Sequence, residues 1–522
     1  GSKMPIIIQD SYAFIATRLS SFGKMFGLEQ QKEIIPYGLY NKENVKKQFI
    51  SKTDIIKYLK HQFKTQNIGV KKDDDYNNKC DEYVKQFYDN CSKWDCVRAN
   101  APKTLCDALE SVEETIDIIK YSKKYCEMDC IVLWEGYKKF KGWINDVCEL
   151  DIGEYISLPS LANDYMLKEG VYDNVYMLSG VPREYIQKSM VGGRTMTARN
   201  KKWRTKNEIA DYDGVSLYPS SMDRLGDIGG YIQGRPKVLE NLTYDYLRQQ
   251  DAYFIKIRIT EVGKKYDFPL MSKVTKEGIR DFNNDMIGEE IYVDKISLED
   301  LIEFHKIKFD VIDGYYYNEG RNNTIKSVIN HLFNTRLEMK KQKNQIQEVY
   351  KLLMNSAYGK TLLKPFDTED KYINGKFLNN HLVKNYDKVK EIIELYGTQY
   401  TKTYKVIHDK EINNHFNNAH IGVEVLSMSK RIMNEVMTTG EDVGCKMYYQ
   451  DTDSIHIELK DVEKLEQAYE SKYGKVLNGK QLGQFHIDFS SDVCKGELKA
   501  VESIFLGKKC YIDKLEGDKK GV

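Results

Sequence analysis

The sequence predicts an α+β fold, and three patterns support this prediction. In Tyr253–Ile259 apolar residues alternate with basic ones, which is the period of a half-buried strand. In Ile325–Phe333 the apolar residues recur at helical spacing instead. Lys446–Glu458 has an apolar run on each side of an acidic bend, as in a strand hairpin. Both element types are therefore expected in one chain.

The composition is typical of a soluble globular protein that is large enough for several domains. The chain has 522 residues, of which 41% are hydrophobic and 30% are charged. Its 79 basic and 78 acidic residues leave a formal net charge of +1, so a surface that binds nucleic acid must come from local segregation of charge. No apolar run could span a bilayer and no secretory signal is visible. We therefore expect a cytoplasmic, nuclear or organellar protein without membrane attachment.

The ten cysteines favour reduced thiols in a reducing compartment. The alternative is a zinc site in the amino-terminal region, although no CxxC pair occurs there. Its ligands would be Cys80, Cys91, Cys96 and Cys106.

The first elements along the chain are helical. A helix is expected in Glu114–Phe140, and Lys71–Asp75 is expected to be a solvated loop. Ser157–Ala162 reads as a turn that leads into another helix.

A mixed α+β segment follows. Tyr253–Ile259, Glu290–Asp294 and Lys308–Tyr317 are predicted strands. Ser297 and Asp300 suit the start of a helix between the last two strands.

The carboxyl-terminal half returns to helices. Two antiparallel helices are expected on either side of a polar elbow at Lys341–Asn344. Asn374-Gly375 is a hairpin signal, because this pair suits the turn between two strands. Val423–Met437 is expected to form an amphipathic helix.

The bend of the last hairpin carries the first candidate site. Residues i and i+2 of an extended strand face the same way, so Asp451 and Asp453 should project together. Two adjacent carboxylates repel each other unless cations neutralise them, and hard oxygen ligands select Mg²⁺ or Mn²⁺. Most isolated Asp-x-Asp pairs are nevertheless solvated loop charges, so this pattern needs a further ligand.

Asp213 is that further candidate. It follows the predicted strand Ile209–Tyr212 and precedes a turn at Ser216–Pro219, where backbone N–H groups suit a metal-bound triphosphate. The alternative is an ordinary Asp that caps a helix.

Cationic side chains form the third group. Arg336 and Lys340 are four residues apart on one predicted helix, and hence on one face. Lys351, Asn355 and Tyr358 have the spacing i, i+4 and i+7 on the next helix. If the two helices pack antiparallel, these faces can converge on one anionic ligand; the alternative is a solvated basic helix.

At these three sites the sequence resembles the family B DNA polymerases. Asp213–Ser220 resembles motif A (DxxSLYPS), Lys351–Gly359 resembles motif B (KxxxNSxYG), and Tyr449–Ser454 resembles motif C (YxDTDS). The motifs occur in the order of the family, and Arg336 with Lys340 matches its finger RxxxK pair.

Two shorter matches extend the resemblance. Lys509-Cys510-Tyr511 is similar to the KxY motif that holds the primer terminus. Gly192-Gly193 occupies the position of the YxGG motif, which contacts the template strand, but Met190 replaces its tyrosine.

The resemblance implies a role for each matching residue. Asp213, Asp451 and Asp453 would be the catalytic carboxylates and would hold two Mg²⁺ ions, with Mn²⁺ as a substitute. The deoxynucleoside triphosphate would contact Arg336, Lys340, Lys351, Asn355, Tyr358, Tyr218, Ser216 and Leu217, with the Tyr218 ring excluding a 2′-OH. The primer-template would contact Lys509, Tyr511, Gly192, Gly193 and Thr452.

The implied fold is a right-hand polymerase core: a palm with an antiparallel sheet, helical fingers, α+β insertions and a remnant of an RNase H-like exonuclease domain. The long insertions are similar to those of the protein-primed, organellar and viral branch, where they contact the priming protein and encircle DNA. The expected domains are residues 3–150 (exonuclease-like), 151–222 (linker and palm), 223–320 (first insertion), 321–362 (fingers), 363–415 (second insertion) and 416–522 (palm).

Parts of the family pattern are missing. Tyr125 and Asp129 resemble the third exonuclease motif, but no DxE precedes them. A two-metal nuclease needs several carboxylates, so we expect no proofreading activity in this chain. The sequence also ends eleven residues after Tyr511, without a thumb, which indicates a fragment or, alternatively, a partner chain that supplies the missing parts.

The expected function is template-directed DNA synthesis on a viral, plasmid or organellar genome. Partners would be DNA primer-template, deoxynucleoside triphosphates, and a priming terminal protein or processivity factor. The competing hypothesis is a catalytically silent DNA-binding chain, which the retention of all three carboxylates opposes. A reverse transcriptase would need Tyr-x-Asp-Asp in place of Tyr449–Asp453.

Overall fold

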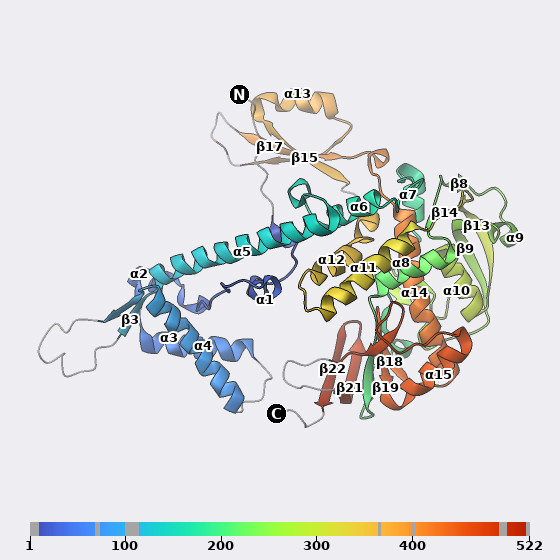
Figure 1. Ribbon diagram of the computed structural model, residues 1–522. Coiled ribbons are helices and arrows are strands. Elements are labelled where there is room, and N and C mark those ends of the chain that lie inside the picture. The colour runs from blue at the N-terminus through green and yellow to red at the C-terminus, as the bar shows by residue number, and fades with distance from the viewer. Residues whose placement is uncertain are drawn as a thin grey trace, which may run out of the picture. The chain divides into compact units, whose positions relative to one another are not determined.

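The structure is a computed structural model, and it describes residues 10–67, 74–99, 114–363, 367–395, 397, 402–489 and 498–517 (Figure 1). The chain divides into two units, residues 1–158 with 339–349, and residues 159–338 with 350–522. Helices and strands are mixed throughout, so the α+β prediction is confirmed. The finer division into six domains stays a prediction. No helix in the described part combines the length and the apolar character needed to cross a membrane.

The first unit is a small antiparallel sheet, in the order β1-β3-β2, with helices around it. Buried Leu59, Phe87, Ile116 and Tyr121 form its core. Its elements are α1 (Phe22–Phe26), α2 (Lys42–Lys47), β1 (Phe49–Ser51), α3 (Lys52–Gln66), α4 (Asp74–Lys93), β2 (Val97–Ala99), β3 (Glu114–Asp117) and α5 (Ile118–Cys148).

Two predictions in this unit were wrong in part. The expected helix at Glu114–Phe140 begins as strand β3, and α5 starts only at Ile118, where the Asp117 side chain caps it. Of the expected loop at Lys71–Asp75, the last two residues belong to α4 and the others lie outside the described residues.

The second unit is built on an eight-stranded sheet in the order β22-β21-β6-β19-β18-β4, with β20 beside β6 and β5 beside β21. The pairs among β6, β19, β18 and β4 are all antiparallel. Buried side chains of α14 and α15 pack on this sheet. The elements are β4 (Thr195–Thr197), β5 (Trp203–Thr205), β6 (Ile209–Gly214), α14 (Ala419–Asp442), β18 (Met447–Asp451), β19 (Ser454–Glu458), α15 (Val462–Tyr473), β20 (Phe485–Ile487), β21 (Leu498–Gly507) and β22 (Cys510–Gly517).

A second sheet, in the order β12-β9-β13-β8, lies in the segment after β6. The three predicted strands are confirmed, and alternate residues of β9 are buried or exposed as expected near Arg258. The helix after β12 begins earlier than predicted, because Asp294 caps it and its carboxylate accepts a hydrogen bond from Ser297 N–H. The bounds are α8 (Leu217–Leu225), β7 (Tyr231–Ile232), β8 (Lys237–Val238), α9 (Tyr244–Leu247), β9 (Ala252–Val262), β10 (Ser272–Val274), β11 (Arg280–Phe282), β12 (Glu290–Asp294), α10 (Lys295–His305), β13 (Ile307–Tyr317) and β14 (Arg321–Asn322).

The predicted pair of helices is present as α11 (Thr324–Lys341) and α12 (Gln347–Ser356), and the predicted apolar residues of α11 are buried. The predicted hairpin at Asn374-Gly375 was wrong. Strand β15 (Thr368–Asn374) ends there and α13 (Gly375–Asn385) begins, because the Asn374 side chain caps the helix by accepting from Lys376 N–H. Strands β16 (Val389–Glu394) and β17 (Thr403–Asp409) complete a three-stranded sheet, and α6 (Leu158–Lys168) and α7 (Gly180–Gln187) precede β4.

Helix α14 is confirmed but is not amphipathic. Nearly all residues from Ala419 to Gly440 are buried, including polar ones such as Glu424 and Asn434. A helix that is buried all round lies inside the molecule rather than on its surface.

Candidate active site

Strand pairing brings the predicted carboxylates together at one edge of the large sheet. Asp213 lies near the end of β6, where its backbone pairs with Ser454 of β19. Ser454 in turn pairs with Asp451, the last residue of β18. The Gly214 N–H donates to the Asp453 carbonyl at 2.8 Å, so the motif A strand also touches the turn between β18 and β19.

The turn itself differs from the extended geometry expected for Asp451 and Asp453. Thr452 has a left-handed φ of 59°, and Asp453 N–H donates to the Asp451 carbonyl at 2.7 Å. Asp451 therefore ends β18, whereas Asp453 lies in a tight two-residue turn, so the two carboxylates do not occupy alternate positions of one strand. The Asp453 carboxylate lies close enough to Asp213 to raise the pKa of that residue.

The electrostatics of the edge are those of crowded acids. Burial and, after it, the neighbouring Asp453, Asp211 and Asp488 carboxylates together raise the pKa of Asp213 to about 7. Burial also raises the pKa of Asp453, with Asp451 and Asp211 adding to the shift. Two half-buried carboxylates that repel each other in this way favour a bound cation.

Asp451 is held differently. Its carboxylate accepts from Lys509 Nζ at 2.5 Å and from Thr195 Oγ1 at 3.2 Å. The backbone N–H of Lys509 donates to the Tyr449 hydroxyl at 2.9 Å, and the Tyr449 and Tyr511 rings lie 4.9 Å apart. The structure thus joins the KxY residues to motif C, a contact that residue spacing could not show.

The diglycine segment packs on the motif C turn. A Cβ at Gly193 would lie 2.5 Å from Thr452 Cγ2, whereas a Cβ at Gly192 would meet nothing within 4 Å. Thr452 N–H also donates to the Arg194 carbonyl at 2.9 Å. A cavity of about 520 Å³ opens beside this contact; its lining includes Gly193, Arg194, Thr452, Arg280 and Lys430.

Motif A and motif B meet through two aromatic rings. Tyr218, in the first turn of α8, stacks on Tyr358 with ring centroids 4.3 Å apart and an interplanar angle of 25°. Ser216, in the left-handed region, precedes this helix, and the Leu217 side chain is buried in the core. Tyr358 lies beyond the end of α12, so its expected place on that helix was wrong.

The predicted cations lie on the two helices as expected. Arg336 is partly buried on α11, and Lys340 is exposed in its last turn, in the stretch that belongs to the first unit. Lys351 and Asn355 are exposed one turn apart on α12. Their convergence on one ligand stays a prediction.

In the first unit, Tyr125 and Asp129 lie one turn apart on α5. Asp129 forms an ion pair with Lys32 at 3.0 Å, and the Tyr125 hydroxyl lies 3.2 Å from that of Tyr37. Asp129 is therefore one member of a partly buried ion pair with Lys32.

The residues present fit divalent cations in part. Asp213 and Asp453 supply the hard oxygen donors that Mg²⁺ prefers, and their raised pKa values are relieved by a cation. Asp451 is turned to Lys509 instead. Within the described ranges, no three His, Cys, Asp or Glu side chains already form a ligand set.

The described residues likewise contain no ligand set for the zinc alternative. Cys80, Cys91 and Cys96 are free and buried, and Cys106 lies outside the described residues.

Comparison with known proteins decides the family. Residues 106–443, more than half of the chain, match the family described as DNA polymerase type B, organellar and viral. The chain belongs to this family. This DNA polymerase B family chain is similar to a DNA polymerase of Kluyveromyces lactis, with 23% identity over 405 residues that cover 73% of the chain and 37% of the relative. A probable DNA polymerase of Ascobolus immersus is 23% identical over 517 residues, 98% of the chain and 36% of the relative. The chain thus spans well under half the length of these two relatives.

Solved structures support the same fold. A ternary complex of phi29 DNA polymerase with primer-template DNA and incoming nucleotide matches with a TM-score of 0.55 and 15% identity, covering 98% of the chain and 68% of phi29 polymerase. Another crystal form of phi29 polymerase gives the same TM-score at 16% identity. The family B assignment and the likeness of fold are therefore confirmed.

Sequence reasoning missed several residues at this edge. Asp211 lies two residues before Asp213 on β6, so the period of a strand could have placed both on one face. Thr195 and Arg194 directly follow the diglycine, but no local pattern shows that they reach Asp451 and the motif C turn.

Proposed function

We propose that this chain transfers deoxynucleotides to a primer 3′-OH under the direction of a DNA template, for a genome of viral, plasmid or organellar type. The observation that carries the proposal is the pairing of β6 with β19, which puts Asp213 beside Asp453 at a sheet edge. Family membership supports it, as does the phi29 complex with primer-template and nucleotide.

In this proposal, Asp213 and Asp453 hold two Mg²⁺ ions, or Mn²⁺ in their place, and Asp451 supports the primer side. When bound, the ions lower the pKa of the primer hydroxyl and neutralise the leaving pyrophosphate. Arg336, Lys340 and Lys351 bind the triphosphate and stabilise its developing charge.

The remaining roles concern sugar, base and DNA. The Tyr218 ring lies beneath the sugar and excludes a 2′-OH, while Tyr358 and Asn355 form the floor of the nascent base pair. Lys509 and Tyr511 steady the primer. Gly192, Gly193 and Thr452 lie against the DNA, and the family's branch suggests a priming protein or processivity factor as a further partner.

Primer extension tests the proposal. Asp453→Asn should abolish Mg²⁺-dependent extension while DNA binding, measured by fluorescence anisotropy, stays within about twofold. Asp442→Asn is the control, because it removes an exposed carboxylate at the end of α14. Extension by the Asp453 variant, or DNA binding without extension by the unaltered chain, would overturn the assignment.

We also propose that this chain has no 3′–5′ exonuclease activity, because Asp129 is paired with Lys32 and a two-metal nuclease needs several acids. A labelled single strand incubated with Mg²⁺ should stay intact. Degradation that survives Asp129→Ala would place a nuclease site elsewhere in the chain.

A further inference from the structure

The carboxyl-terminal end of α8 and the short turn after it, Gly226–Ile228, carry side chains that face two different helices. On one side, Asn330 Nδ2 of α11 donates to Asp223 Oδ1 at 2.5 Å, and Lys326 of α11 forms an ion pair with Asp227. Lys326 and Asn330 are one helical turn apart and so lie on one face of α11. Two polar contacts therefore fix α11 in both position and rotation.

A glycine lies between these contacts. A Cβ at Gly226 would lie 2.5 Å from Lys326 Cβ and 2.9 Å from Asn323 Oδ1. At Gly230, where φ is 90°, a Cβ would lie 2.0 Å from the Asn322 carbonyl oxygen. The backbone after α8 thus approaches the base of α11 as closely as sterics permit, which leaves α11 little room to slide.

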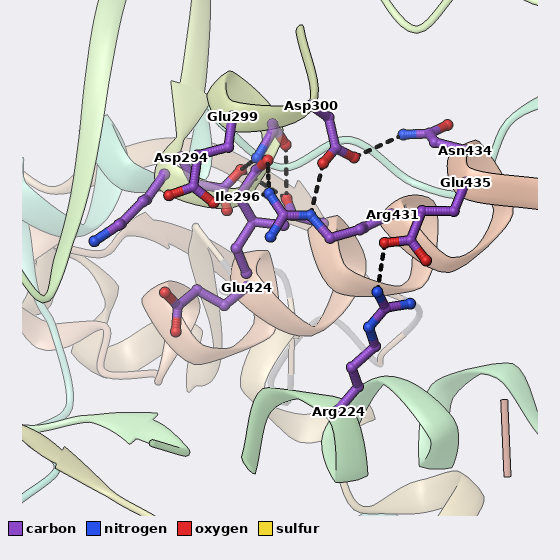
Figure 2. A network of polar contacts seen from close by, with 12 residues as sticks. Arg224, Asp294, Ile296, Glu299, Asp300, Glu424, Arg431, Asn434 and Glu435 are labelled. Carbon is purple, nitrogen blue, oxygen red and sulfur yellow. Dashed lines mark hydrogen bonds and ion pairs between the residues drawn. The ribbon is translucent and has the colours of Figure 1, made fainter. Parts of the chain in front are cut away.

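On its other side, the end of α8 is fixed to α14. Figure 2 shows the Arg224 guanidinium directed at Glu435 of α14, with which it forms an ion pair. Neither side chain is well exposed, at 21% for Arg224 and 9% for Glu435. Further along α14, Arg431 Nε and Asn434 Nδ2 both donate to Asp300, at 2.6 and 2.9 Å (Figure 2).

These contacts make the end of α8 a joint between two functional parts of the chain. The same helix carries Tyr218 in its first turn, directly after motif A. Helix α11 carries Arg336, and α14 leads into β18, which ends at Asp451. A change in the angle of α11 at this joint moves Arg336 relative to Tyr218 without moving the carboxylates.

We propose that Asp223 and Asp227 are positioning residues, which set the angle of α11 and thereby align the finger cations with the sugar-binding ring of motif A. The proposal rests on the proposed function. Because the finger cations bind the triphosphate and stabilise its developing charge, a weakened joint lowers kcat/KM for deoxynucleotide and leaves the primer-template contacts unchanged.

The test is a set of steady-state extension assays at saturating primer-template. For the double variant Asp223→Ala, Asp227→Ala we expect kcat/KM for deoxynucleotide to fall on the order of tenfold, with primer-template affinity within about twofold. Asp227→Lys alone should also lower kcat/KM for deoxynucleotide, and adding Lys326→Asp should recover much of that loss, since the exchange restores the ion pair in reverse. Asp245→Ala is the control, because it removes an exposed carboxylate whose ion pair is with its near neighbour Arg248.

Two outcomes would overturn the inference. One is an unchanged kcat/KM for deoxynucleotide in the double variant. The other is a fall in kcat that parallels a lower melting temperature, since this indicates a general loss of structure. Titration of a fluorescent deoxynucleotide gives the same comparison without catalysis, so an unaltered chain that binds nucleotide but does not extend a primer would refute the proposed function alone.

Discussion

At the scale of single residues, the raised pKa of Asp213 has a consequence for metal dependence. Its pKa is raised to about 7, chiefly by burial and then by Asp453, so protons and Mg²⁺ compete for the carboxylate below that pH. The Mg²⁺ concentration for half-maximal extension should therefore rise steeply between pH 8 and pH 6. A half-maximal concentration that is constant over this range would contradict the shift.

The same group affects stability in the absence of metal. Because the folded pKa exceeds the unfolded value of 3.8, the folded state holds the proton more tightly, and the protein loses stability as pH rises from about 4 to 7. Asp213→Asn removes this loss. In a chelator, the variant should melt above the unaltered chain at pH 8, and the difference should shrink toward pH 4.

Tyr358 gives a third prediction at this scale. Its ring lies 4.3 Å from that of Tyr218, so if Tyr218 excludes the 2′-OH as proposed, Tyr358→Ala should raise ribonucleotide incorporation roughly three- to tenfold. Tyr358→Phe keeps the stacking ring and serves as the control. Competition between ribo- and deoxynucleotides in extension assays measures the effect, and equal selectivity in both variants would contradict it.

Single residues also show what the sequence could not determine. Asp213, Asp451 and Asp453 could be named because their motifs are local. The left-handed backbone of Thr452 could not be predicted, because the same sequence is compatible with a two-residue turn and with an extended strand. Likewise the bond from Lys509 to Asp451 joins residues that only the folded sheet brings together.

At the scale of elements, the diglycine before β4 is predicted to control the motif C turn. Gly193→Ala would place a Cβ 2.5 Å from Thr452 Cγ2 and should lower extension on the order of tenfold or more. Gly192→Ala is a matched control, since nothing lies within 4 Å of its Cβ.

Rescue makes the cause specific. Thr452→Ser removes the methyl group that the new Cβ would meet, so the double variant Gly193→Ala, Thr452→Ser should regain part of the lost extension. If Gly192→Ala is as harmful as Gly193→Ala, flexibility of the segment and not its close contact explains the effect.

Helix α14 carries the second prediction for an element. Arg321 and Glu424 form an ion pair with side chains only 8% and 1% exposed. Glu424→Ala should cost about 3–5 kcal/mol of unfolding free energy in urea, because it leaves a buried cation without its partner. The double variant Arg321→Met, Glu424→Leu should recover most of it.

A surface pair is the control for that measurement. Lys308 and Glu261 are 71% and 53% exposed, so Glu261→Ala should leave the urea midpoint nearly unchanged. Similar losses of unfolding free energy in Glu424→Ala and Glu261→Ala would show that the buried pair stabilises the protein no more than the exposed pair.

Elements were predicted best where hydrophobic period alone decides, as in β9, β12 and α11. The predictions were wrong where a single side chain is compatible with two local structures. Asn374 could form the turn of a hairpin or cap a helix. The hairpin is excluded because β15 pairs with β17, and not with the segment that directly follows Asn374. The burial of α14 on all sides likewise depends on the sheets around it.

At the scale of the whole molecule, the near balance of 79 basic and 78 acidic residues leaves little long-range attraction for DNA. Binding should then depend on a few local phosphate contacts. The logarithm of the dissociation constant should increase linearly with the logarithm of salt concentration, with a slope near 0.9 per duplex phosphate neutralised. Lys509→Met should reduce that slope by about one if the Lys509 side chain contacts a primer phosphate. An unchanged slope would indicate that Lys509 pairs with Asp451 and contacts no phosphate.

The ion pairs that converge on α14 also restrict how such a sequence can diverge. Arg224 with Glu435, Arg321 with Glu424, and Arg431 with Asp300 each join residues more than a hundred positions apart. Loss of either member alone is costly, so the two codons of a pair should change together over evolutionary time. Related genes should therefore show correlated substitutions at these positions, even where overall similarity has faded.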